Sequence, residues 1–421
     1  MNNMSRMDIT NKNMFLLCIV FVFLSFNYSN ALLFGSNCKD ENDCISCTKH
    51  KTWSGENCRW CPRDEACHAQ GSLLNKCSRT ENIVKPADCD KIIYAKYDKD
   101  LAYKMIYLSA LAYADDVAKY IPKASEVNTF QLVKQVTKPC SGSAMCSGFV
   151  SISQSEKAIA VAFRGTQHIK QLVNEILRIL TEPKQSFQPG GKVQVYFLDA
   201  FQIVWNDLQN FVYEEIEKYP NYKVWVTGHS LGATLASLAS TLIASEQKTT
   251  KDNLILYTFG QPRVGNYDYA LAHDGLVPLS FRVTHFRDIV VHLPTCKVVV
   301  PGTPCVALGG GPYHHGKEIF YGSEIMTKSS SYKVCEGLPH NEDLGCSNNP
   351  LVWSKCFSSQ LPKCIDDHKQ YFSINIGTWW KNHTHHEEPS SNANSPIRHL
   401  DLYHMIGQII LGLLYEMQIS R

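Results

Sequence analysis

The sequence lacks an excess of charge of either sign. Its 421 residues include 41 Lys and Arg against 39 Asp and Glu, which gives a formal net charge of +2 at pH 7. Proteins that bind nucleic acids or other polyanions usually carry a clear basic excess on at least one domain. The composition therefore predicts no nucleic-acid partner.

The N-terminal apolar run is also too short to span a bilayer. The run MFLLCIVFVFLSF, from Met14 to Phe26, has thirteen residues, whereas a transmembrane helix needs about twenty. A polar start precedes it, and the small residues Ser29 and Ala31 follow it, as in a secretory signal. We expect residues 1–31 to be a cleaved signal peptide rather than a retained anchor. The mature protein is then secreted, with a lysosomal location as the alternative.

Cysteine, in contrast, is abundant. Of seventeen cysteines, Cys18 lies in the predicted signal, which leaves an even number for disulfides in an extracellular protein. Eight of them lie between Cys38 and Cys89, and the next is Cys140. Such a short segment buries too little apolar surface to fold without cross-links. Its CISC and CRWC pairs could alternatively bind zinc, but an oxidising compartment favours disulfides.

This cysteine-rich segment, residues 32–90, resembles the plexin–semaphorin–integrin (PSI) module. The likeness rests on the pattern C-x5-C-x2-C-x10-CRWC-x5-C, on two later cysteines, and on Trp60 inside CRWC. The resemblance implies the pairs Cys38–Cys58, Cys44–Cys89, Cys47–Cys67 and Cys61–Cys77. Since the segment carries no catalytic constellation, we expect it to be a spacer or docking module, and its protein partner is unknown.

From residue 91 onward, strand patterns alternate with helix patterns. Short apolar runs such as AIAVAF, KVWVT and NLILYTF are separated by longer helical patterns, for example from Phe201 to Tyr219. Nearly continuous apolar strands between helices predict an α/β domain with a mainly parallel central sheet that is buried on both faces. We assign this domain to residues 91–385. Residues 386–421 would form a linker and a C-terminal helix or tail that docks rather than anchors.

The sequence GHSLG, from Gly228 to Gly232, fits the nucleophile-elbow pattern G-x-S-x-G. A strand pattern precedes it and an Ala- and Leu-rich helix pattern follows it. The glycines are needed because the serine sits on a strained turn, where a bulkier neighbour would clash. The start of the helix also directs backbone N–H groups toward a developing anion. Ser230 is therefore the candidate nucleophile of a hydrolase.

A serine hydroxyl needs a base, and the base needs an orienting acid. In folds of this kind the chain order is serine, acid, histidine. Asp288 is the leading acid because it closely follows the apolar run SFRVTHF; Asp268 and Asp274 are interpreted as solvated loop carboxylates. Spacing alone leaves the base open between His368 and the pair His314 and His315.

Several motifs in order resemble the class 3 (fungal-type) triacylglycerol lipases of the α/β-hydrolase fold. They are AFRGT, VTGHSLGATLASL, YTFGQPRVGN, RVTHFRDIVVHLP and DDHKQYF, and the likeness spans about residues 106–376. The resemblance implies that Asp288 is the acid and His368 the base, whereas His315 matches a family position that is not the base. It also implies an oxyanion hole formed by Leu231 and Thr166.

The segment after Thr166 has a broad apolar face over residues 169–180. The resemblance implies that it is a lid that opens at a lipid surface, and an ordinary packed helix is the alternative. The family's usual tryptophan is absent here, and FLDAF replaces the family's usual turn. Reaction type is therefore better defined than substrate.

These patterns predict a secreted lipase that hydrolyses triacylglycerol-like esters by a Ser-His-Asp acyl-enzyme mechanism, without a metal or organic cofactor. Its partner would be lipid at an interface, with peripheral contact to a membrane or droplet surface. The alternatives are a non-catalytic lipid-binding protein and an esterase or phospholipase.

We expect glycosylation at Asn382, and we interpret the nearby HTHHEE as a solvated tail rather than a metal site. Four more local disulfides are expected: Cys140–Cys146, Cys296–Cys305, Cys335–Cys346 and Cys356–Cys364.

Overall fold

The computed structural model describes residues 37–383, except residues 53, 63–64, 76, 78–81, 92–95, 142–143, 167–182, 299–302, 304, 308–309, 337–340, 350–355 and 357–359. The predicted signal peptide, the lid segment 169–180 and the C-terminal segment 386–421 lie outside the described residues. The chain divides into two compact units, Met1–Ile92 and Ile93–Arg421. We call them the N-terminal unit and the C-terminal unit.

The N-terminal unit is a small fold held by disulfides. Its elements are η1 (Asn37–Asp40), α2 (Cys44–Lys49), β1 (Arg59–Cys61), β2 (Ala66–His68) and η2 (Pro86–Lys91), with β1 and β2 paired antiparallel. The four disulfides are those that the resemblance implied: Cys38–Cys58, Cys44–Cys89, Cys47–Cys67 and Cys61–Cys77. Because these thiols are bonded to one another, the alternative zinc site is wrong.

The C-terminal unit is built on an eight-stranded sheet with the order β14-β13-β11-β9-β8-β5-β4-β3. Strands β5, β8, β9, β11 and β13 are parallel to one another, so the predicted mainly parallel sheet is confirmed. The strands are β3 (Gln131–Ser141), β4 (Ala144–Ser153), β5 (Ala158–Phe163), β8 (Lys223–His229), β9 (Leu254–Phe259), β11 (Ser280–His285), β13 (Lys317–Tyr321) and β14 (Lys333–Cys335).

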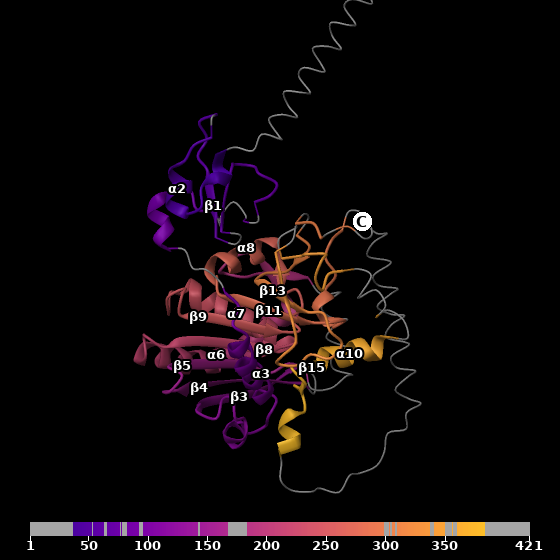
Figure 1. The fold of residues 1–421 in the computed structure, drawn as a ribbon. Coiled ribbons are helices and arrows are strands. Elements are labelled where there is room, and N and C mark those ends of the chain that lie inside the picture. The colour runs from indigo at the N-terminus through magenta and orange to yellow at the C-terminus, as the bar shows by residue number, and fades with distance from the viewer. Residues whose placement is uncertain are drawn as a thin grey trace, which may run out of the picture. The chain divides into compact units, whose positions relative to one another are not determined.

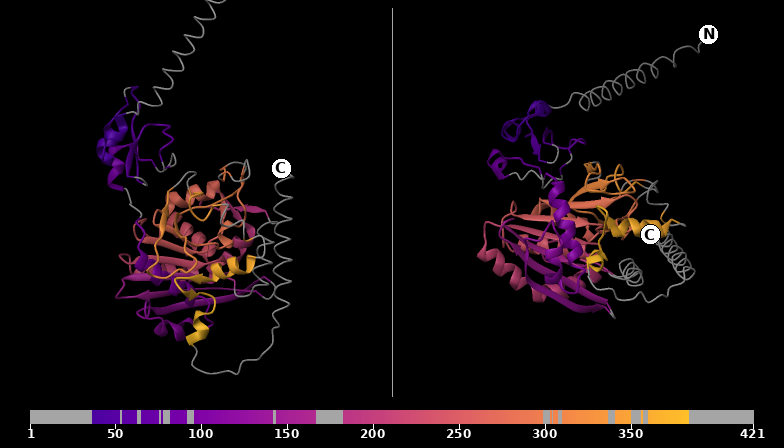
Figure 2. Two further views of the ribbon diagram at one scale, coloured as in Figure 1. Left: turned by 45° about the vertical axis from the view of Figure 1, so that its right-hand side comes forward. Right: turned by 60° about the horizontal axis from the view of Figure 1, so that its bottom comes forward.

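Helices cover both faces of this sheet (Figure 1, Figure 2). Helix α3 (Lys99–Leu111) packs on one face, and helices α6 (Val195–Lys218) and α7 (Leu231–Ser245) pack on the other. Successive side chains of a strand point to opposite faces. Toward α3, β5 presents only small side chains, those of Ala158, Ala160 and Ala162. Toward α6 and α7 it presents the larger Ile159, Val161 and Phe163.

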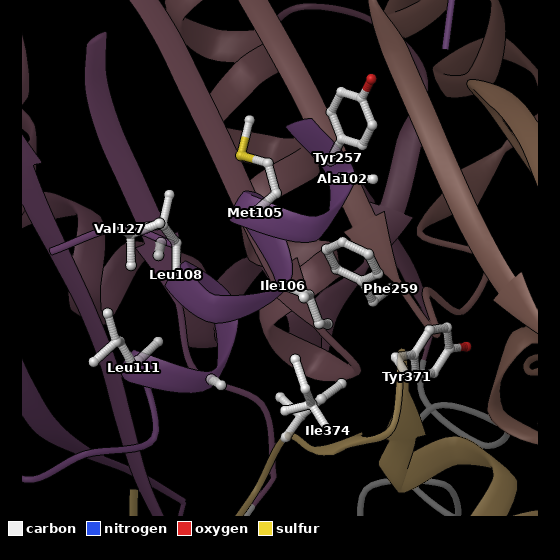
Figure 3. Close-up of a cluster of buried hydrophobic side chains, with 14 of the residues drawn as sticks. Ala102, Met105, Ile106, Leu108, Leu111, Val127, Tyr257, Phe259, Tyr371 and Ile374 are labelled. Atoms are coloured by element: carbon white, nitrogen blue, oxygen red, sulfur yellow. The ribbon is translucent and has the colours of Figure 1, made fainter. Parts of the chain in front are cut away.

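The core under α3 also fixes a segment near the C-terminal end of the described chain. Figure 3 shows side chains of α3 gathered with Tyr257 and Phe259 of β9 and with Tyr371 and Ile374. Tyr371 and Ile374 belong to the short antiparallel pair β15 (Gln370–Tyr371) and β16 (Ile374–Asn375). Burial of these side chains therefore anchors the chain next to α10 (Leu361–Lys369), the helix that carries His368.

Shorter elements complete the C-terminal unit. A second sheet has the order β12-β10-β7-β6. The remaining elements are α4 (Val117–Tyr120), η3 (Ile121–Lys123), β6 (Lys184–Ser186), β7 (Lys192–Gln194), β10 (Gly265–Asn266), α8 (Tyr267–Leu276), η4 (Val290–His292), β12 (Pro312–Tyr313) and η6 (Trp379–His383). The four local disulfides expected in this unit are confirmed. Within the described ranges, no helix is both long and apolar enough to cross a bilayer.

A buried ion pair braces the loop that follows Asp288. The Arg263 guanidinium donates to both carboxylate oxygens of Glu342, at 2.8 and 2.7 Å, and both side chains are almost fully buried. Arg263 also donates to the carbonyl oxygens of His292 and Pro294. One cation thus joins the backbone at His292 and Pro294 to the side chain of Glu342, which is distant in sequence.

We predict that Arg263→Ala lowers the free energy of unfolding of the C-terminal unit by about 3–5 kcal/mol, because it leaves the Glu342 carboxylate buried without its partner. Denaturant unfolding with the disulfides intact measures the change. Lys138→Ala is the control, since its pair with Asp207 is about half exposed and should contribute no more than about 1 kcal/mol. Equal effects of the two substitutions would contradict the bracing role.

Candidate active site

Ser230 occupies a strained turn between β8 and α7. Its backbone has φ 59° and ψ −128°, a left-handed φ that a non-glycine residue rarely adopts and that clusters at functional sites. A Cβ on Gly228 would lie 2.2 Å from the carbonyl oxygen of Gly232, and a Cβ on Gly232 would lie 2.2 Å from that of Phe163. The two motif glycines are therefore required for the strand, the turn and the helix to pack this closely.

Asp288 and His368 are hydrogen-bonded to each other. His368 Nδ1 donates to Asp288 Oδ2 at 2.8 Å, and the Tyr371 hydroxyl donates to the same oxygen at 2.7 Å. The Val290 N–H donates to Asp288 Oδ1 at 2.8 Å. Burial alone would raise the pKa of Asp288, but His368 and Tyr371 outweigh it and hold this pKa below its usual value. Asp288 is therefore an ionised acceptor that orients the His368 ring.

The other ring nitrogen of His368 is available as a base. Because Nδ1 carries the proton that Asp288 accepts, Nε2 carries the lone pair. Nε2 is buried and has no hydrogen-bond partner within the described part of the chain. The ring lies 4.5 Å, centroid to centroid, from that of His229, the residue before Ser230. No hydrogen bond joins Ser230 and His368 here, and such bonds often tighten only when substrate binds.

His229 and Tyr113 form hydrogen bonds that hold the backbone at His368 in place. His229 Nε2 donates to the His368 carbonyl oxygen at 2.8 Å, which leaves Nδ1 to accept from the Tyr113 hydroxyl at 2.9 Å. Burial and the neighbouring His368 lower the pKa of His229 to about 3, so its ring stays neutral. The contacts of Tyr113, His229 and Tyr371 at this site were not predicted from the sequence. Two of these residues lie inside the quoted motifs, His229 in GHSLG and Tyr371 in DDHKQYF.

The two predicted oxyanion donors lie near Ser230. Leu231 follows it in the chain, and Thr166 belongs to a segment that passes close to it in space. Leu231 is the first residue of α7, so its N–H has no acceptor within its own helix. Thr166 follows Gly165, where an added Cβ would lie 2.4 Å from the His229 carbonyl oxygen and 3.0 Å from Ser230 Cβ. The chain after β5 therefore runs directly past Ser230, the candidate nucleophile. Both positions are compatible with the predicted role.

His315 and His314, the competing histidines, make other contacts. His315 Nε2 is hydrogen-bonded to Ser237 Oγ at 2.8 Å, and its ring packs against His273 at 3.8 Å between centroids. Burial, and then the neighbouring His273, keep the pKa of His315 well below its usual value. His314 Nε2 donates to the Val291 carbonyl oxygen. These histidines brace the fold, and neither is hydrogen-bonded to Ser230 or Asp288.

The interpretation of Asp268 and Asp274 as loop carboxylates is wrong, because both lie on helix α8, although Asp268 is exposed to solvent as expected and Asp274 is half-buried. Asp274 accepts hydrogen bonds from the Gly316 N–H and from Asn341 Nδ2, each at 2.7 Å. Asp268 accepts from Asn266 Nδ2 at 3.0 Å, at the start of the helix. Neither carboxylate is hydrogen-bonded to His368, and Asp274 instead joins α8 to the chain at Gly316 and Asn341.

We predict that Gly260→Ala abolishes most activity while the protein stays folded. Gly260 has φ +58°, and an added Cβ would lie 2.8 Å from both Asp288 Oδ2 and His368 Nδ1. Displacing these groups should lower kcat/KM by about 100-fold, as a misplacement of about 1 Å can do. Gly275→Ala, where nothing lies within 4 Å of the added atom, should keep wild-type turnover. Wild-type kcat/KM in Gly260→Ala would show that this close packing is dispensable.

Comparisons with known proteins agree with the geometry. The family model described as Lipase (class 3) matches residues 160–298. The protein named Lipase ZK262.3 from Caenorhabditis elegans is 33% identical, over 75% of this chain and 90% of that protein. A lipase from Rhizopus niveus is 31% identical, over 62% of this chain and 57% of that protein.

The solved structure of lipase II from Rhizopus niveus matches with a TM-score of 0.54 at 28% identity. The match covers 67% of this chain and 96% of that one, and it confirms the predicted α/β-hydrolase fold. Because the nematode relative is matched over nearly its whole length and the family model spans the nucleophile elbow, the chain belongs to the class 3 lipase family.

Proposed function

We propose that Ser230, His368 and Asp288 form the catalytic triad of this lipase. As a member of its family, the chain is a carboxylic ester hydrolase. The observation that carries the residue assignment is the buried hydrogen bond of 2.8 Å between His368 and Asp288. It lies beside a serine whose turn has the backbone strain of a nucleophile elbow.

The reaction follows from the roles of these groups. His368 Nε2 takes the Ser230 hydroxyl proton while Oγ attacks the ester carbonyl carbon. The N–H groups of Leu231 and Thr166 stabilise the resulting oxyanion, and Asp288 stabilises the imidazolium. His368 then protonates the leaving alcohol. Water, activated by the same histidine, releases the fatty acid from the acyl-enzyme.

The proposed substrates are triacylglycerol-like lipids at a lipid–water interface. Ser230 is 3% exposed, so a lipid ester does not reach Oγ without a movement of the surrounding chain. The predicted lid, residues 169–180, follows Thr166 in sequence, and it stays a prediction because it lies outside the described residues. An esterase or a phospholipase remains the alternative. Turnover of emulsified triglyceride, phospholipid and soluble short-chain ester in parallel separates the three.

We further propose that the protein is secreted and glycosylated. Eight disulfides support an oxidising compartment, which agrees with a signal peptide at residues 1–31. Asn382 is exposed on η6, where a glycan would meet solvent. In this proposal residues 32–90 are a PSI-like module, residues 91–385 the lipase domain and residues 386–421 a linker and tail.

We expect Ser230→Ala to abolish ester hydrolysis without unfolding the protein, since loss of a triad nucleophile lowers kcat by about a million-fold in a serine hydrolase. Release of fatty acid from emulsified triglyceride measures activity, and thermal unfolding checks the fold. A purified variant with a tenth of wild-type turnover would exclude Ser230 as the nucleophile. Wild-type protein without any esterase activity would favour a lipid-binding role instead.

His368→Ala should lose as much activity as Ser230→Ala, whereas His315→Ala should keep most of its turnover. The reason is that His368 bonds to Asp288 while His315 bonds to Ser237 and Gln261. Turnover per folded molecule is compared, because His315 is buried and its loss should lower stability. Inactivation by His315→Ala alone, in folded protein, would overturn the assignment of the base.

A further inference from the structure

The N-terminal unit exposes two adjacent leucines that its own core does not use. Leu73 and Leu74 are 82% and 80% exposed, and they lie in the loop that follows β2. Of the large apolar side chains that the structure describes in this unit, Ile45 is the next most exposed at 43%. Keeping two neighbouring leucines in water is unfavourable unless something covers them.

The loop is fixed rather than loosely attached. The Asn75 N–H donates to the Ser72 carbonyl oxygen, and the Leu74 N–H donates to Ser72 Oγ, both at 3.3 Å. The Asn75 side chain accepts from the Cys77 N–H at 2.9 Å and donates to Asn82 at 2.8 Å. Cys77 is bonded to Cys61 of β1. Both leucines are therefore held at the surface, so little conformational entropy of the loop is lost when a partner covers them.

A cavity of about 430 Å³, most of whose lining residues are of polar type, lies beside the leucines. Ser72 and Asn75, which flank them, line it together with Gln70, Asn82 and Arg59. The Arg59 guanidinium donates from Nη2 to Gln70 at 2.8 Å, while its Nε is buried without a hydrogen-bond partner. Arg59 forms no ion pair with any carboxylate that the structure describes. Among the side chains that line this cavity, Arg59 carries the charge, which is positive.

We propose that the Leu73–Leu74 loop and the Arg59 cavity are a docking site for an anionic phospholipid surface. A site that binds at the boundary between headgroups and acyl chains needs an apolar side chain next to a polar, cationic group, and the loop and the Arg59 cavity together present both. A guanidinium suits phosphate oxygens because it donates in a fixed planar fork. Stable attachment to a membrane takes two signals, and here apolar insertion and charge attraction supply them.

Two other kinds of occupant would each account for only one of the two features of this site. A soluble phosphate compound would use the Arg59 cavity but would leave the leucines exposed. A protein partner would cover the leucines, but nothing in the loop selects a particular protein surface. A lipid surface accounts for both features, and it is also where the proposed substrate of the C-terminal unit is found.

Sedimentation with vesicles tests the docking site on the whole secreted chain. The protein carries Ser230→Ala, so the vesicles are not hydrolysed and binding does not depend on the proposed triad. Vesicles of phosphatidylcholine alone are compared with vesicles that also contain phosphatidylserine. We expect tighter binding to the anionic vesicles. Leu73→Ser with Leu74→Ser should weaken binding to both by at least about tenfold, whereas Ile45→Ser, on α2, should leave it unchanged.

Arg59→Gln should reduce only the preference for anionic vesicles, by about fivefold. All these variants should keep wild-type turnover of a soluble ester in an otherwise native chain. Unchanged vesicle binding after loss of both leucines, or an equal loss in Ile45→Ser, would overturn the proposal. So would saturable binding of inorganic phosphate that Arg59→Gln removes without any change in vesicle binding, because the cavity would then be a site for a soluble anion.

Discussion

The site depends on one buried hydrogen bond, from His368 Nδ1 to Asp288 Oδ2. A carboxylate that is 0% exposed stays ionised only if the protein replaces the water it has lost. Tyr371 and the Val290 amide provide that replacement. Gly260 leaves the space that the pair needs. The loop after Asp288 must also be fixed, which is what the buried Arg263 achieves.

A second constraint joins this pair to Ser230, the proposed nucleophile. The strained backbone conformation of Ser230 persists only because the surrounding strands and helix hold it in place. The Ser230 N–H donates to the Phe259 carbonyl oxygen at the end of β9, and Gly260, the next residue, touches the acid–base pair. The order of the parallel strands β8, β9 and β11 therefore sets which residues meet, because their carboxyl ends lie at one edge of the sheet.

The parts of this protein that local chemistry determines could be predicted from its sequence. The elbow at Ser230 follows from glycine spacing, and the strands follow from apolar runs. The choice of His368 over His315 required a family resemblance, because chain separation says nothing about spatial contact. Tyr113 was missed for the same reason: its hydroxyl meets His229 across 116 residues. Asp274 was misread because a polar segment that looks like a loop is a helix, stabilised by contacts made outside it.

A neighbouring carboxylate distinguishes His368, the proposed base, from the other buried histidines. A general base must become a cation during the reaction, and burial opposes that charge. It lowers the pKa of His229 and His292 to about 3 and that of His273 to about 4. Of the buried histidines that the structure describes, His368 alone has a ring nitrogen hydrogen-bonded to a carboxylate. Asp288 therefore supplies a negative charge next to the ring of the proposed base, where the positive charge of the imidazolium would form.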